Sequence, residues 1–249
     1  GTNGEFVLMR EDGTCLATSV PLGPALEGIG PDCGRLAGPG TITSFVLTPF
    51  GPEPRLFEGG TLAPGGRAAG ISATGYLSLL ALLLKTGFLL PEGQFSSDSG
   101  SLQPLARRLL SSLDRKSAVP RLMLPGNVWL SLSDVEEILK VKAAFSVALD
   151  SLLSAAGEGV KSRVTLCIAG ALGEHADPGD LETLGFIPSG MAGAVRAVGN
   201  TSLEGAGLLG LHQDLRERLS RMCADISLLR PDQEQNFHRR YIDAMHFGG

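Results

Sequence analysis

The chain has 249 residues, which is enough for one large domain or two small ones with a buried core. Apolar residues make up 43% and charged residues 19%, so the chain is not disordered, and its 34 glycines and 15 prolines follow no collagen-like period. The net charge of −5 argues against a nucleic-acid groove and against an anionic membrane surface.

The positions of the basic and sulfur-containing residues add further exclusions. Arg107, Arg108, Arg115 and Lys116 are interrupted by leucine and serine, so no basic patch is predicted. The four cysteines lie far apart, with no CxxC and no Cys/His pair at metal-ligand spacing, which predicts core thiols and no metal site within this chain. Residues 76–90 are too short to span a bilayer and contain Lys85, and no signal peptide is present. We therefore expect a soluble, cytoplasmic protein.

The first third of the chain indicates a hairpin, a strand and a helix. Residues 1–5 predict a glycine turn with no strand before it, as in a piece of a longer protein. Strands at residues 6–9 and 15–19 flank Asp12-Gly13, a hairpin signal. A strand is predicted at residues 42–47, a loop-like region at 49–70 with Leu56-Phe57 as an edge strand, and a buried helix at 71–84 closed by Gly87.

The remainder predicts an α/β unit. Residues 91–120 mix Ser, Gly and Pro with an amphipathic piece at 105–113, and we interpret about 91–127 as an excursion. A helix begins at Ser133, whose capping box with Glu136 is followed by helical spacing of apolar residues to Gly157. The later elements are a strand at 164–169, a helix at 180–184, a strand at 195–198, helices at 203–211 and 213–223, a strand at 226–229 and a helix at 232–247.

Three glycine-containing turns, at residues 1–5, 170–174 and 199–202, are the candidate ligand sites. Each also fits tight packing without a ligand, and Asn200 is a good helix cap in its own right. Together they favour one nucleotide cleft, because backbone N–H groups converge where strands end.

Among the ionisable side chains, Glu5 and Glu27 lie beside glycine turns and could hold a magnesium-bound water or simply face solvent. Lys142 is either solvated or a ligand contact, and His175 follows the second turn and could sit near the cleft. No catalytic nucleophile motif or Walker-type loop occurs.

Several segments, in order, resemble one family. They are residues 1–5, 23–28 (GPALEG), 73–75 (ATG), 142–144 (KAA), 168–173 (IAGALG), 198–206 (VGNTSLEGA) and 237–245 (FHRRYIDAM). Together they resemble the C-terminal domain of the reductive activators of corrinoid proteins, within the sugar kinase, heat-shock protein and actin ATPase superfamily. The likeness covers nearly the whole chain.

The resemblance implies an α/β fold for residues 1–249: the second lobe of an actin-like, ribonuclease H-like ATPase domain, with a mixed sheet flanked by helices. The first lobe and a ferredoxin-like domain with a 2Fe-2S cluster would belong to the full-length protein and not to this chain. That protein would couple ATP hydrolysis, with Mg²⁺, to the reduction of Co(II) to Co(I) in a partner corrinoid protein of a methyltransferase system. ATPase activity is expected only in the full-length protein, which could be a homodimer.

The resemblance also assigns roles to residues. Nucleotide contacts would come from Gly1, Thr2, Asn3 and Gly4 in a phosphate-binding turn, from Gly170, Ala171 and Gly173 in an adenosine-side turn, and from Gly199, Asn200 and Lys142. Glu5 and Glu27 would orient water or the metal. Two alternatives remain: a kinase or an activator of another redox enzyme, such as a radical dehydratase, and a non-enzymatic interaction module that has lost nucleotide binding.

Overall fold

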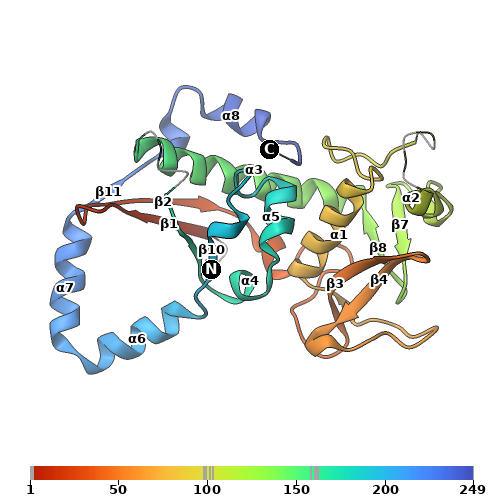
Figure 1. Ribbon diagram of the computed structural model, residues 1–249, viewed down its shortest axis with the longest axis horizontal. Helices are drawn as coiled ribbons and strands as arrows, with labels where there is room; N and C mark the ends of the chain where they lie inside the picture. The colour runs from red at the N-terminus through yellow and green to blue at the C-terminus, as the bar shows by residue number, and fades with distance from the viewer. Residues whose placement is uncertain are drawn as a thin grey trace.

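A three-stranded sheet built on an N-terminal hairpin forms one layer of the computed structural model (Figure 1). The structure describes residues 3–97, 100, 102, 104–157, 159 and 163–248, and only the backbone of residues 27, 105 and 171. The strands are β1 (Asn3–Met9), β2 (Cys15–Pro21) and β11 (Ile226–Leu228), with β1 antiparallel and β11 parallel to β2. Asp12 closes the hairpin turn by accepting hydrogen bonds from the N–H and hydroxyl of Thr14 at 2.9 and 2.7 Å. The predicted hairpin is confirmed.

The long helix α3 (Leu132–Ala155) covers one face of this sheet. Phe145 on α3 lies edge-on to Phe6 of β1 and to Phe186, with ring centroids 4.8 and 5.5 Å apart. The capping box is formed by Ser131 and Asp134, so the prediction of Ser133 with Glu136 is wrong. Both serines precede an acid by three residues, but only Ser131 ends an extended strand, where a cap residue must have non-helical dihedrals.

A second sheet and helix α1 form the next unit. The sheet has the order β4-β3-β5, with β3 (Thr41–Thr48), β4 (Gly51–Leu56) and β5 (Gly70–Ile71). Helix α1 (Ala73–Lys85) packs on β3 and on α5 (Pro178–Leu184), and nine of its residues are buried, as its apolar composition predicted. Ile71 lies in β5 rather than in the helix, which begins after the cap residue Ser72.

The predicted loop at residues 49–70 is wrong at β4, which starts at Gly51. Pro52 and Pro54 argued against a strand, because proline donates no hydrogen bond to a ladder. β4 is an edge strand, and there the missing donors cost little. Phe57 belongs to the short 3-10 helix that follows and not to the strand.

Residues 100–131 contain a small sheet that the sequence did not predict. Helix α2 (Pro104–Leu109) precedes β6 (Leu113–Asp114), β7 (Arg121–Leu124) and β8 (Val128–Ser131), which pair in that order as antiparallel neighbours. Ala106, Leu122 and Leu130 are fully buried. These side chains belong to the same apolar core as those of the rest of the chain, and this part forms one end of the molecule (Figure 1).

A parallel strand pair follows α3. β9 (Leu166–Ile168) and β10 (Val195–Ala197) are connected through α4 (Ala171–His175) and α5, and α6 (Thr201–Leu211) and α7 (Gln213–Ala224) then form an arm leading to β11 (Figure 1). The predicted strands at 164–169 and 195–198 and the helices at 203–211 and 213–223 are confirmed with small shifts at their ends.

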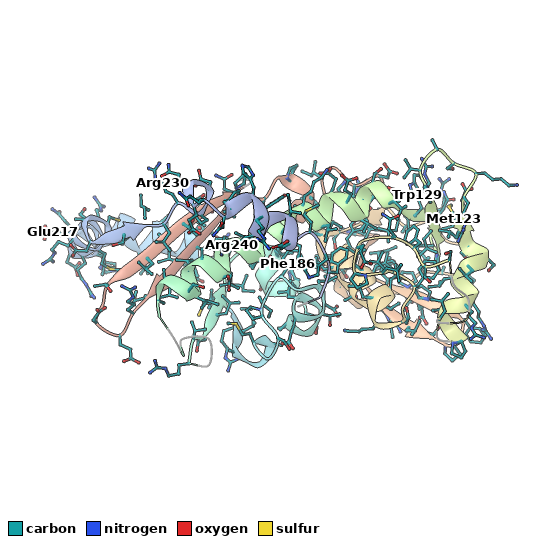
Figure 2. All side chains as sticks on the ribbon, turned by 90° about the horizontal axis from the view of Figure 1, so that it is seen from above. Met123, Trp129, Phe186, Glu217, Arg230 and Arg240 are labelled. Carbon is teal, nitrogen blue, oxygen red and sulfur yellow. The ribbon has the colours of Figure 1, made fainter. Side chains whose placement is uncertain are left out.

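The C-terminal segment lies against α3. Helix α8 (Phe237–Asp243) is shorter than the predicted helix at 232–247. Arg240 ties α8 to α3, since its guanidinium donates to the Asp150 carboxylate at 3.2 Å and the Ser151 hydroxyl at 2.9 Å (Figure 2). Phe247 is buried, and its N–H donates to the Pro91 carbonyl at 2.7 Å. Contacts of this kind, and not a continuation of helix α8, hold Phe247 in place.

Candidate functional site

A large cavity lies where β1, β9 and the starts of α1 and α6 meet. Its volume is about 1290 Å³. The polar and glycine residues that line it are Asn3, Gly4, Glu5, Gly23, Thr43, Ser44, Ser72, Thr74, Thr165, Gly170, His175, Asn200, Thr201 and Ser202. Apolar side chains from α3 and β9 complete the wall, so the cavity has both an apolar and a hydrogen-bonding part.

Two helices begin at this cavity, and each has a side-chain cap. Ser72 Oγ accepts the N–H of Gly75 at 3.2 Å at the start of α1, and Asn200 Oδ1 accepts the N–H of Leu203 at 3.1 Å at the start of α6. Other N–H groups of these first turns lack intrahelical partners and carry the positive end of the helix dipole. Both helix starts can therefore attract an anion.

Ser72 and Thr74 are cavity residues that the prediction missed. Their hydroxyl oxygens are 2.9 Å apart, and both line the cavity at the start of α1. The signal was in the sequence: Ser72 stands three residues before Gly75, ahead of an apolar helix, which is a cap pattern. The resemblance had pointed to residues 73–75 without assigning them a ligand role.

The second and third predicted glycine turns are brought together. The N–H of Gly170 donates to the carbonyl of Gly199 at 2.8 Å, and the N–H of Val198 donates to the carbonyl of Ile168 at 3.1 Å. Gly170 has φ +88°, a conformation that favours glycine, and no atom lies within 4 Å of a Cβ built there. The backbone at Gly170 is thus open to the cavity.

Gly173 has a packing role in the same turn. A Cβ at this position would lie 2.5 Å from Ile168 Cγ2 and 2.7 Å from the Ile168 carbonyl oxygen. Only glycine allows α4 to approach β9 this closely. Gly173 does not line the cavity, and the side chain of Ala171 lies outside the described residues.

The first predicted turn is wrong for residues 3–5. Asn3, Gly4 and Glu5 form the start of β1, with Asn3 opposite Pro21 and Glu5 opposite Ser19. The glycine content favoured a turn, but pairing with β2 satisfies the backbone as a strand. All three residues line the cavity, whereas Gly1 and Thr2 lie outside the described residues.

The two candidate acids differ in what the structure describes. Glu5 is exposed at the cavity and is the only carboxylate among the described lining side chains. Glu27 ends a short 3-10 helix that follows Gly23, and its side chain lies outside the described residues. His175 lines the cavity, as predicted.

Lys142 does not line the cavity. Its side chain on α3 is 3% exposed, so the prediction of a solvated lysine is wrong. Nζ donates to the carbonyl of His246 at 2.8 Å and to that of Ala244 at 3.2 Å. Burial lowers the pKa of Lys142 to about 8. The lysine thus fastens the C-terminal segment to α3.

This burial predicts a pH-dependent stability. Between about pH 8 and pH 10.5 the unfolded lysine binds more proton than the folded one, so stability rises with pH across that window. In Lys142→Met this increase should be absent. Urea unfolding of both proteins at several pH values gives the difference between their free energies of unfolding at each pH. The contributions of the other titrating groups are common to both proteins and cancel in this difference. Parallel pH profiles would contradict the assignment.

The electrostatics of the cavity rest on backbone and hydroxyl groups. No Lys or Arg side chain from the described ranges lines it, and in the same ranges no three His, Cys, Asp or Glu side chains cluster to hold a metal ion. An anionic ligand would therefore be bound by helix N-termini and hydroxyls. A cation at this site would need oxygen ligands from the anion itself in addition to Glu5.

The remaining sequence predictions concern thiols and membranes. Cys15 is buried, but Cys167 and Cys223 are exposed, so the prediction of core thiols is wrong for these two. Cys167 lies on β9 at the cavity. None of the described helices is both long enough and apolar enough to cross a bilayer.

The chain is similar to proteins that act on corrinoid proteins, both in sequence and in structure. Two curated relatives are the "[Co(II) methylated amine-specific corrinoid protein] reductase" of Methanosarcina barkeri, 28% identical over 82% of this chain, and the "Corrinoid activation enzyme RamQ" of Eubacterium limosum, 26% identical over 86%. The matched parts are 36% of the length of each relative. A solved structure, "Reductive activator for corrinoid,iron-sulfur protein", superposes with a TM-score of 0.82 over 99% of this chain and 38% of its own, at 21% identity.

The superposition shows that the chain shares the fold of this activator, with sheets flanked by helices, and the family match identifies it as the actin-like ATPase fold that the resemblance implied. The family model described as the "C-terminal domain of RACo the ASKHA domain" matches residues 1–249. The chain therefore belongs to the family of C-terminal ASKHA domains of the corrinoid reductive activators.

Proposed function

We propose that this domain is the nucleotide-binding lobe of an ATP-dependent activator that returns Co(II) corrinoid proteins to Co(I). The observation that carries the proposal is the cavity at which two capped helix starts and the Gly170 backbone meet. Its volume of about 1290 Å³ exceeds that of typical small-molecule pockets, about 300–1,000 Å³. The cavity is therefore large enough to hold a nucleotide.

The lining residues suggest how a nucleotide would lie. The hydroxyls of Ser72 and Thr74 and the free N–H groups of α1 would bind phosphate oxygens. The open backbone at Gly170 and the side chains of Ile168 and Leu172 would pack against the flat faces of the base. Asn3 and Asn200 would contact the nucleotide from either side of the cavity, although the amide oxygen of Asn200 already caps α6.

Magnesium fits the site as a partner of the phosphates. Mg²⁺ keeps several waters and binds through one or two carboxylates plus substrate phosphates. Glu5 supplies a carboxylate at the cavity and would hold a metal-bound water there. Because no lysine or arginine of the described chain lines the cavity, nucleotide affinity should depend strongly on Mg²⁺.

ATP supplies the binding and hydrolysis energy that drives the reduction, in which Co(II) gains one electron to become Co(I). The chain's own groups bind the nucleotide and orient it. A difference in nucleotide affinity between two lobe arrangements sets how far binding moves them. The corrinoid carries the redox chemistry, and the electron would come through an iron–sulfur domain outside this chain. The partner of the full-length protein would be a corrinoid protein of a methyltransferase system. The full-length protein would act in the cytoplasm and could form a homodimer.

Calorimetric titration of ATP tests the proposal in a full-length protein that carries this domain. With Mg²⁺ present we expect one binding site per chain, and without Mg²⁺ a markedly weaker affinity. Titration of Mg²⁺ alone is the control. If the protein binds no nucleotide, the domain is instead an interaction module that kept the fold.

A further inference from the structure

We propose that the end of the molecule formed by the β3–β4 turn and residues 104–131 docks an acidic face of the corrinoid protein. The inference rests on the proposed function. The docking face consists of Phe50 together with four exposed cations, Arg107, Arg108, Arg115 and Lys116. None of these five residues lines the cavity described above.

Phe50 is an apolar side chain presented to solvent on a fixed turn. It is 91% exposed, more than any other large apolar side chain of the described residues. The Thr48 hydroxyl accepts the N–H of Phe50 at 3.2 Å and donates to the carbonyl of Gly51 at 3.0 Å. The Arg108 guanidinium donates to the carbonyl of Pro49 at 2.5 Å. Binding would therefore cost little backbone entropy.

The four cations of this face differ from other basic residues of the chain in their ion pairing. In the described part of the chain none of the four forms a salt bridge, whereas Lys85, Lys140 and Arg240 all do. The one acid of residues 104–131, Asp114, accepts the backbone N–H of Lys116 and the Ser117 hydroxyl. This end is thus basic in a chain of net charge −5.

No basic patch was predicted at residues 107–116, because leucine and serine separate the four cations along the chain. Helix α2 packs against β4 and against the 3-10 helix Leu110–Ser112 that leads into β6, and the connection from β6 to β7 carries Arg115 and Lys116. Figure 2 shows Met123 and Trp129 at this end and Glu217 at the other. Met123 is 41% exposed and adds apolar surface.

The chemistry of this face selects the occupant. Aromatic residues, including Phe, and arginines are enriched in protein interfaces relative to the rest of the surface. Unpaired cations favour an acidic partner and speed its association. A long polyanion such as DNA is disfavoured, since the rest of the chain is acidic and would repel it. The corrinoid protein is the macromolecular partner that the proposed function requires.

The test measures binding of the purified Co(II) corrinoid protein to the full-length activator by biolayer interferometry. Phe50→Ser and the double variant Arg115→Glu/Lys116→Glu change side chains with no described structural contact, so the fold should survive. We expect each of the two variants to weaken binding of the corrinoid protein at least tenfold. The charge variant should also bind with a weaker dependence on salt concentration than the wild type. Mg-ATP affinity should not change.

Matched controls lie on the opposite arm. Leu211 on α6 is 82% exposed, and Arg218 lies exposed on α7. Leu211→Ser and Arg218→Glu should bind the corrinoid protein like the wild type. Unchanged binding in the Phe50 and Arg115/Lys116 variants, or equal losses in the controls, would overturn the inference. Binding of a DNA duplex that these variants abolish would also overturn it. An activator that binds no corrinoid protein at all would contradict the proposed function as well.

Discussion

Gly75→Val should unfold this domain at a much lower urea concentration than the wild type. A Cβ at Gly75 would lie 2.6 Å from the Ile42 carbonyl oxygen and 2.9 Å from Ile71 Cγ2, both in the fully buried core. The Ile42 carbonyl also accepts the N–H of Ser72 at 2.9 Å, so it cannot move without disturbing the start of α1. Overpacking of this kind costs about 3 kcal/mol.

Gly205 provides a matched control, because it also lies in a helix. No atom lies within 4 Å of a Cβ built at Gly205 on α6. Gly205→Val should therefore leave the midpoint of urea unfolding close to that of the wild type, since valine has no lower helix propensity than glycine. If both variants unfolded at the wild-type urea concentration, the close contact of α1 with β3 would not be present in solution.

Gly170→Val should reduce Mg-ATP affinity at least tenfold, about 1.4 kcal/mol. Gly170 has φ +88°, a region that a β-branched residue does not tolerate. Valine would displace the backbone and place methyl groups in the cavity that Gly170 lines. The calorimetric affinity of the full-length protein gives the measurement.

Gly65→Val is the control for backbone strain alone. Gly65 has φ +69° and open space around its Cβ position, as at Gly170, but it lies outside the cavity. Its replacement should destabilise the loop without changing nucleotide affinity. Equal losses of affinity in the two variants would show that strain, and not blockage of the cavity, explains the result.

Most elements could be predicted, because their signals are local. Asp12-Gly13 fixed the hairpin, and Asn200 predicted the start of α6. The errors arose where tertiary contacts, and not the local sequence, decide which secondary structure forms. Two serines had acids three residues later, and only the end of β8 selects Ser131. The strand β4 carries prolines that an edge position tolerates.

The cavity was predicted in part. The turns at Gly170 and Gly199 do meet, as strand ends in an α/β fold should. Ser72 and Thr74 were missed because the helix was predicted to begin at residue 71, which placed both residues inside an apolar helix instead of at its capped start. Lys142 was expected in solvent or at a ligand, since the local pattern around it cannot reveal the C-terminal carbonyls, about a hundred residues later, that accept its hydrogen bonds.

The most direct test of the central claim is formation of Co(I) in a corrinoid protein, followed by its absorption spectrum. A full-length activator carrying this domain, the Co(II) corrinoid protein and a reductant are mixed with or without Mg-ATP. Co(I) should accumulate only with Mg-ATP, and Gly170→Val should abolish the effect of the nucleotide. Equal Co(I) formation without nucleotide would contradict the account.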